Sequence, residues 1–189
     1  MAKDPVVTKI EEAGYKTAMR GLSLNKEQPV ENMPRLAGKL AFADAGSHRK
    51  FLRQIYLSWE IRISRKTWTE FDTYKVGVVR NSGSTMHNIH KRPFLITDFR
   101  SIFVNELLWL NQCWRRFKNG DPDMDLDTLK GRIPEDYLQT AVVSMNYEVL
   151  RTMYHDRKAH RLPEWPLLLE DMLKQIDHPE LILQETPDA

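Results

Sequence analysis

A strict alternation of side chains between residues 55 and 64 constrains the fold of this chain more than any other stretch. Apolar residues occupy every second position: Ile55, Leu57, Trp59, Ile61 and Ile63. A period of two is typical of a β-strand with one face buried. A lone strand leaves its backbone donors and acceptors without partners, so the sequence predicts at least a small sheet around this segment.

Most of the remaining chain has the apolar spacing of helices and the residues that usually begin and end them. Pro34 and Gly46 bracket one short helix, and residues 47–54 are expected to add a further turn or two. The other predicted helices cover residues 6–24, 66–75, 98–118, 134–157 and 162–176, with Thr97 or Asp98 as the cap of the third. The expected fold class is α+β, mostly helical, with a small antiparallel or mixed sheet.

Length and composition favour one ordinary globular domain. The chain has 189 residues, of which 41% are apolar and 29% charged, and this is the balance of a folded core. We expect an N-terminal helix and loop over 1–34, a core over 35–183, and a frayed tail over 184–189. Cys113, the only cysteine, lies among apolar residues of a predicted helix and is expected to be buried.

Charge and hydropathy exclude several classes of protein. A net charge of +2 gives no global basic field, so there is no strong nucleic-acid signal. The start of the chain lacks an apolar run, and the longest apolar windows are broken by charges well short of a membrane span. The sequence therefore predicts a cytoplasmic protein with no membrane segment.

The stretch from Arg132 to Trp165 holds the first candidate binding residues. Asn146 and Arg157 are eleven residues apart on the predicted 134–157 helix, so they point the same way, roughly 16 Å apart along its axis. Arginine can bind a phosphate group with two hydrogen bonds, and further cations surround Arg157: His155, Lys158, His160 and Arg161. The alternative is that these cations complement the carboxyl end of the helix and are otherwise solvated.

A polar loop over residues 77–90 holds the second set of candidates. Its segment RNSGSTMH brings hydroxyl groups and Gly83 together, so Ser82, Ser84 and nearby backbone N–H groups could cradle a phosphate. The alternative is a capped turn leading into a short helix. His87 is the best candidate for proton transfer, because the ordinary pKa of histidine lies near neutrality.

Metal sites are not expected. The acidic residues of DPDMDLD alternate as in a calcium loop, but the sixth position of that frame is Leu126 and the twelfth is Arg132. His87 and His90 have a spacing that metal ligands on a helix can have, yet no third ligand is evident. The sequence therefore predicts no bound metal.

Taken in order, these segments resemble the flavin-dependent thymidylate synthase family over residues 35–173. The strand IYLSWEIRIS, the helix RKTWTEFDTYK and the loop RNSGST follow one another as in that family. Ile133 and Pro134 stand for the family's Leu-Pro step, Asn146 for its helix asparagine, and Arg157 for the arginine at the helix end. At the family's Arg-His-Arg flavin motif this chain has Thr73, Tyr74 and Lys75 instead.

The resemblance implies a specific chemistry and assembly. Family members methylate dUMP with FAD, NADPH and methylene tetrahydrofolate, as homotetramers with sites between subunits. It implies that Asn146, Arg157, Arg80, Asn81 and Ser82 bind the nucleotide, the loop residues acting from a neighbouring subunit. It further implies an FAD site that contains Tyr74, Trp68 and Lys75. The rings of Tyr74 and Trp68 would stack on the ligand. Ser84 and His87 are then the predicted catalytic residues.

Three hypotheses of function follow. The first is a divergent, thymidylate-synthase-like protein that binds a pyrimidine nucleotide and modifies its base. The second, favoured by the loss of Arg-His-Arg, is a non-catalytic bacteriophage protein that uses the scaffold to bind a host protein or to sequester a nucleotide signal. It rests also on segments similar to STMH and FDTYK in uncharacterised phage proteins, and it implies the cytoplasm of a bacterial host. The third is a structural module whose Asn146 and Arg157 stripe forms a homo-oligomer interface.

Overall fold

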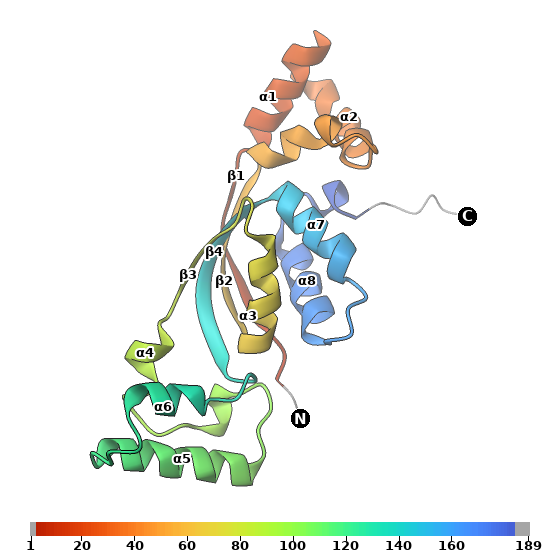
Figure 1. Ribbon diagram of the computed structural model, residues 1–189. Coiled ribbons are helices and arrows are strands. Elements are labelled where there is room, and N and C mark those ends of the chain that lie inside the picture. Colours follow the sequence, from red (N-terminus) through yellow and green to blue (C-terminus); the bar gives the residue numbers. More distant parts are fainter. Residues whose placement is uncertain (1–2, 184–189) are drawn as a thin grey trace. The chain divides into compact units, whose positions relative to one another are not determined.

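The computed structural model describes residues 3–183, in which helices alternate with the strands of one sheet (Figure 1). The strands are β1 (Val6–Ala13), β2 (Tyr56–Ser64), β3 (Val79–Ser82) and β4 (Leu138–Asn146). They form an antiparallel sheet in the order β1-β2-β4-β3. The fold is α+β and mostly helical, which confirms the predicted class.

Helices of two kinds connect these strands. The α-helices are α1 (Tyr15–Lys26), α2 (Met33–Ala41), α3 (Arg65–Phe71), α4 (Thr85–Asn88), α5 (Val104–Lys118), α6 (Leu126–Gly131), α7 (Tyr147–Arg157) and α8 (Glu164–Gln175). Short 3-10 helices are η1 (Val30–Asn32), η2 (Gly46–Gln54), η3 (Asp72–Tyr74), η4 (Ile96–Asp98) and η5 (Pro179–Leu181). Within residues 3–183 no helix has both the length and the apolar character needed to cross a bilayer.

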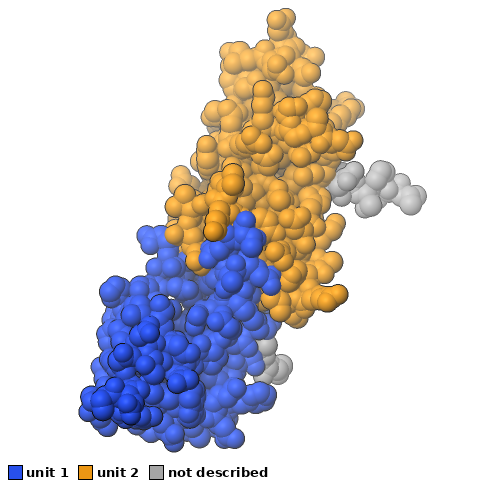
Figure 2. All heavy atoms as spheres, viewed as in Figure 1, with its two compact units in different colours: residues 1–6, 61–73, 81–141 blue, residues 7–60, 74–80, 142–189 orange. Residues whose placement is uncertain are grey.

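The chain forms two compact units (Figure 2). Among the described residues, unit 1 comprises 3–6, 61–73 and 81–141, and unit 2 comprises 7–60, 74–80 and 142–183. The single domain expected from chain length stays a prediction, and the expected frayed tail over 184–189 lies outside the described residues.

Unit 2 has a helical core built from distant parts of the chain. Helices α1, α2 and η2 pack on one another, and α7 packs against both η2 and α8 (Figure 1). Buried apolar side chains fill the space between them, among them Met19, Ala37, Phe51, Leu150, Trp165 and Met172. Unit 1 has its own apolar cluster: Ile89, Phe94, Phe99, Leu110, Cys113, Met124, Leu129 and Ile133. Cys113 is 3% exposed, so its predicted burial is confirmed.

The helix predicted over residues 6–24 is wrong in its first half, which is strand β1. Gly14 ends that strand with a backbone φ of 95°. A side chain at Gly14 would place its Cβ only 1.9 Å from the carbonyl oxygen of Gln54, so only glycine fits. The helix begins after this glycine, at Tyr15. The β-branched residues before it, Val6, Val7, Thr8 and Ile10, suit a strand.

The single helix predicted over residues 134–157 is also wrong, because its first half is strand β4. Ala141, Val143 and Met145 are buried, while Val142 and Ser144 between them are exposed. This alternation has the period of two that is typical of a strand. The strand contains both β-branched and small residues, and we read its apolar positions as the continuation of the helix that follows. The helix α7 occupies only residues 147–157.

Two further predicted boundaries differ from the structure. The polar loop expected over 77–90 contains strand β3 and helix α4. The helix expected from Thr97 or Asp98 begins at Val104, because Asp98 instead accepts two hydrogen bonds from Arg92, at 2.8 and 2.7 Å. The alternating segment is β2, as predicted, and the helix predicted over 66–75 is α3 followed by η3, ending at Tyr74. The helix predicted over 34–46 is α2, which ends already at Ala41, and the turns predicted over 47–54 lie in η2. The helix predicted over 162–176 is α8, Glu164–Gln175.

Candidate functional site

Arg157, the strongest sequence candidate, lies in a cluster of aromatic and polar side chains in unit 2. Its Nε donates a hydrogen bond to the Tyr74 hydroxyl at 3.0 Å, and one terminal nitrogen lies 2.8 Å from Nε2 of His160. The Tyr74 hydroxyl in turn donates to a carboxylate oxygen of Asp156 at 3.2 Å. The guanidinium also lies over two rings, 5.8 Å from the centre of Tyr74 and 5.4 Å from that of Trp165. Arg157 is therefore held by its own chain.

Electrostatics keep the hydroxyl of this cluster protonated. Burial raises the pKa of Tyr74, although the hydrogen bond and the positive charge of Arg157 act in the opposite direction. A protonated phenol can donate to Asp156 while its oxygen accepts from Arg157. The cluster is thus a continuous hydrogen-bonded chain, and a phosphate at Arg157 would compete with two groups already bound there.

Asn146 lies at the N-cap of α7 rather than in the middle of a helix. Its Oδ1 accepts a hydrogen bond from the Val149 backbone N–H at 3.0 Å, which is the usual task of an N-cap asparagine. Its Nδ2 faces Gly77, where an added Cβ would lie 3.4 Å away. Asn146 and Arg157 are therefore at opposite ends of α7, and the predicted mid-helix position of the asparagine is wrong.

The loop residues predicted to approach a nucleotide fall in β3 and α4. Arg80, at the end of the unit 2 segment, is half-buried, and in unit 1 Ser82 is half-buried while Asn81 and Ser84 are exposed. His87 is exposed on α4. The Gly83 N–H is not available to a phosphate, because it donates to the carbonyl of Thr140 at 3.1 Å. The rest of the predicted phosphate cradle, with Ser82 and Ser84, stays a prediction.

The predicted cofactor residues have three different environments. Trp68 is 2% exposed, its indole N–H donates to the Gln139 carbonyl at 2.8 Å, and its ring meets Phe71 edge-on. A ring so enclosed has no free face for a flavin, so Trp68 is a core residue of unit 1. Lys75 is exposed, and Tyr74 is part of the Arg157 cluster.

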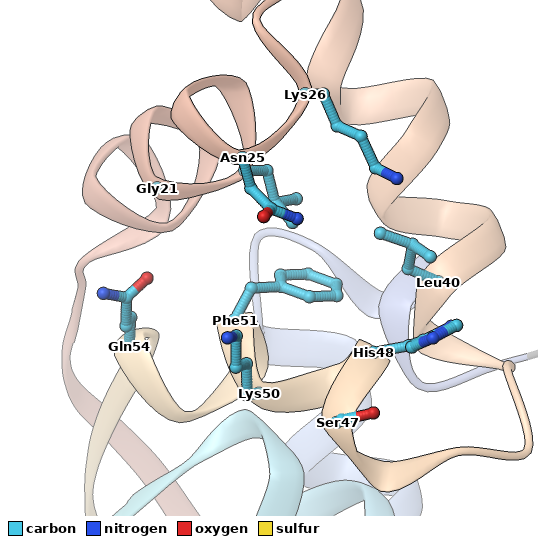
Figure 3. A pocket seen from close by; sticks show the side chains of 10 residues that line it. Gly21, Asn25, Lys26, Leu40, Ser47, His48, Lys50, Phe51 and Gln54 are labelled. Carbon is cyan, nitrogen blue, oxygen red and sulfur yellow. The ribbon is translucent and has the colours of Figure 1, made fainter.

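A cationic pocket that the sequence did not predict lies between α1, α2 and η2 of unit 2 (Figure 3). Its volume is about 460 Å³. It is lined by Gly21, Leu22, Asn25, Lys26, Leu40, Ser47, His48, Lys50, Phe51 and Gln54. Figure 3 shows the Asn25 amide above the Phe51 ring, with Lys26 and Leu40 on one side and Gln54 on the other. We call this the α1–α2–η2 pocket.

The charges of this pocket are not neutralised by the protein. No carboxylate lines it, and within residues 3–183 neither Lys26 nor Lys50 makes a hydrogen bond or an ion pair. The surrounding segment, residues 15–54, has eight Lys and Arg against three Asp and Glu. That local excess was visible in the sequence but was hidden in the whole-chain charge of +2. The pocket therefore suits an anion that also carries hydrogen-bonding groups.

No group of three or more His, Cys, Asp and Glu side chains between residues 3 and 183 is arranged as metal ligands. The lining of the α1–α2–η2 pocket offers ammonium, imidazole and amide groups, which can bind an organic anion.

No protein-family model and no curated protein matches the chain. Solved structures do match it. One is a crystal structure of thymidylate synthase X from Helicobacter pylori with FAD and dUMP, with 15% identity, a TM-score of 0.78, and coverage of 94% of this chain and 97% of that one. A second structure of the same flavin-dependent enzyme complexed with FAD and dUMP gives 15% identity and a TM-score of 0.78, with 93% and 97% coverage. The chain therefore has the fold of flavin-dependent thymidylate synthases, which confirms the fold expected from the resemblance.

Proposed function

We propose that this protein binds a pyrimidine nucleotide in the α1–α2–η2 pocket. The observation that carries the proposal is the pair of lysines, Lys26 and Lys50, which line the pocket and have no partner of their own within residues 3–183. The similar Helicobacter pylori structures contain dUMP and FAD, and this supports a nucleotide as the class of ligand.

The chemistry of the lining suits each part of a mononucleotide. The two ammonium groups can donate charge-assisted hydrogen bonds to a phosphate. The side-chain amides of Asn25 and Gln54 offer both donors and acceptors, as the edge of a pyrimidine base requires. Leu22, Leu40 and Phe51 supply apolar surface, and a volume of about 460 Å³ is within the usual range for small-ligand pockets.

FAD is the larger ligand that the fold implies. Of the residues predicted to hold it, Trp68 is enclosed in the core, whereas the α1–α2–η2 pocket has two cations that fit a diphosphate. We therefore propose that Lys26 and Lys50 would hold the diphosphate of FAD in place of the nucleotide phosphate, so that FAD and the mononucleotide would compete for this pocket. A bound flavin would supply hydride transfer to the reaction.

Base modification is the finer part of the proposal and rests on the resemblance. In it Ser84 and His87 take part in catalysis. The resemblance also offers an alternative nucleotide site to the α1–α2–η2 pocket, with the loop residues acting from a neighbouring subunit: Arg80, Asn81, Ser82, Asn146 and Arg157. His87 is exposed on α4, so it is accessible to a ligand. His87→Ala should abolish turnover of dUMP and leave its binding affinity unchanged; loss of both would contradict a catalytic role.

The test of the proposed function starts from freshly purified protein. We expect a flavin absorbance band or, in native mass spectrometry, a bound mass equal to a nucleotide. In parallel, dUMP should raise the melting temperature of the wild type and of Lys39→Gln, a control lysine on α2 outside the pocket, but not of the double variant Lys26→Gln/Lys50→Gln. Colourless protein whose melting temperature responds to neither dUMP nor FAD would refute the proposal.

We propose a homo-oligomer, which the resemblance implies to be a tetramer, from the open face of the strands in unit 2. Tyr56 on β2 and Val142 on β4 are exposed, and Ser58 and Ser144 on the same strands lie 3.1 Å apart between their hydroxyl oxygens. A sheet face with exposed apolar residues is a usual site of subunit contact. Light scattering should give a multimer for the wild type and a smaller species for Val142→Glu. The same measurement on Asn146→Ala and Arg157→Ala separates a role in assembly from a role in ligand binding.

A second function, binding of a host protein by a non-catalytic phage protein, is favoured by one region of unit 1. Six large apolar residues are exposed around the start of α5: Leu95, Ile96, Phe103, Val104, Leu108 and Trp109. Contiguous exposed apolar patches often mark sites of protein–protein contact. A stoichiometric partner captured from host lysate should survive Arg157→Ala and be lost with Leu108→Glu. Capture that is unchanged by Leu108→Glu would contradict this candidate.

A further inference from the structure

A second group of cations in unit 2 lies outside the α1–α2–η2 pocket. Arg151 and His155 are one turn apart on α7, and η2, which carries Arg49, packs against that helix. Arg49 lies between His48 and Lys50 in sequence, but it does not line the pocket as they do. The guanidinium of Arg151 lies over the Phe42 ring, 5.6 Å from its centre.

Both arginines in this group have an unused donor. The Nε atoms of Arg49 and Arg151 are buried and have no hydrogen-bond partner within residues 3–183. A terminal nitrogen of Arg49 donates to the carbonyls of Ala43 and Asp44, which fixes its guanidinium in place. Buried donors without partners are rare in folded proteins, and a bound water or ion is one of the explanations for them.

The local charge is positive and poorly compensated. The negative charge of Glu148 acts on Arg151, but Glu148 is already ion-paired with Arg53. Burial and then the charge of Arg49 lower the pKa of Arg151. Burial, together with Arg151, Lys158 and Arg49, also lowers the pKa of His155, and only Asp156 acts in the opposite direction. Cations held together against their own repulsion favour an anion between them.

We infer that Arg49, Arg151 and His155 form a binding site for a tetrahedral oxyanion such as a phosphate group. Two guanidinium groups can each present fixed donors to its oxygens, and an imidazolium can add a third. The site does not depend on the proposed nucleotide pocket, whose lining shares none of these residues. The oxyanion is either free phosphate or the phosphoryl group of a larger molecule.

Inorganic phosphate is the first probe, compared with chloride at equal ionic strength and near-neutral pH. Phosphate should raise the melting temperature of the wild type and should raise the pKa of His155, followed by NMR of its ring protons. Arg151→Gln should weaken the response at least tenfold, whereas Arg151→Lys, which keeps the charge, should keep part of it. Arg35→Gln, an exposed arginine on α2, is the matched control and should respond as the wild type does.

Comparison of dUMP with uridine and with inorganic phosphate identifies the source of the oxyanion. A response of His155 to phosphate alone assigns the site to the free ion, and a response to dUMP but not to uridine or phosphate assigns it to a phosphoryl group on a nucleotide. No change at His155 with any of the three, or an equal change in Arg151→Gln, would overturn the inference. The double variant Lys26→Gln/Lys50→Gln should leave the phosphate response intact, so failure here is distinct from failure of the proposed function.

Discussion

Two cationic regions of unit 2 differ in whether their positively charged side chains have partners within the protein. At the end of α7, Arg157 is bound by the Tyr74 hydroxyl and by His160 and is covered by the Trp165 ring. In the α1–α2–η2 pocket, Lys26 and Lys50 have no partner in the described part of the chain. The comparison teaches that a cation marks a ligand site only where the protein itself leaves it unneutralised. We therefore expect the first region to contribute to stability and the second to binding.

Arg157→Ala should have the largest effect, and that effect should be on stability. Removing the guanidinium takes one hydrogen bond each from the half-buried Tyr74 hydroxyl and from His160, and the ring contact with Trp165 is lost, so the free energy of unfolding should fall by about 2 kcal/mol. Urea denaturation followed by tryptophan fluorescence measures the change. A stability within about 0.5 kcal/mol of the wild type would break the comparison, because that is the effect of an ordinary surface substitution.

Lys26→Gln/Lys50→Gln should show the converse behaviour. The affinity for dUMP should fall by about 10- to 100-fold, since two charge-assisted hydrogen bonds are removed. The free energy of unfolding should change by less than about 0.5 kcal/mol, because neither lysine has a partner to lose. Isothermal titration calorimetry gives the affinity, with Lys39→Gln as the control. An unchanged affinity in the double variant would place the phosphate elsewhere.

Gly21→Ala separates stability from binding within one helix. Gly21 lies inside α1, where alanine is the better helix former by about 0.5–1 kcal/mol. The new Cβ would lie 3.2 Å from Oε1 of Gln54 and push that amide, so the affinity for dUMP should fall a few-fold. Gly38→Ala on α2, where nothing lies within 4 Å of the new Cβ, should stabilise without changing affinity. Equal affinities for the two variants would argue against a role for Gln54.

The pH dependence of stability gives the smallest expected effect. The folded state lowers the pKa of His155 below its ordinary value of about 6.5. The corresponding stability is present above about pH 6.5 and is lost as the pH falls through the folded-state pKa. Thermal unfolding of the wild type and of His155→Gln across this window tests the sign. A wild type that loses no more stability than His155→Gln on acidification would contradict it.

The sequence predicts those elements of the fold whose side-chain pattern is unambiguous. The alternation in β2 and the helix predicted over 162–176, which is α8, both appear where expected. The failures at β1 and β4 have one cause: Val6–Ala13 and Leu138–Asn146 each run directly into a helix, so the two periods merge into one apparent stripe. Gly14 was the available signal for the first boundary, and Asn146 as an N-cap residue for the second.

The candidate site is less predictable than the fold because it depends on contacts between distant segments. Arg157 is a recognisable phosphate ligand by residue type, but its bond to Tyr74, eighty-three residues away in sequence, is invisible without the structure. The α1–α2–η2 pocket likewise takes Asn25, Leu40 and Lys50 from three different elements. Residue types suggest what a site can bind, and tertiary contacts decide whether those residues are available.

The most direct test of this account is an NMR map of where dUMP binds to the isotopically labelled protein. The account predicts that the backbone signals of Asn25, Lys26 and His48 shift on addition of dUMP, while the indole signal of Trp165 beside Arg157 stays in place. A shift of the Trp165 indole with no change at Asn25 and His48 would contradict it and would return Arg157 to the role of phosphate ligand.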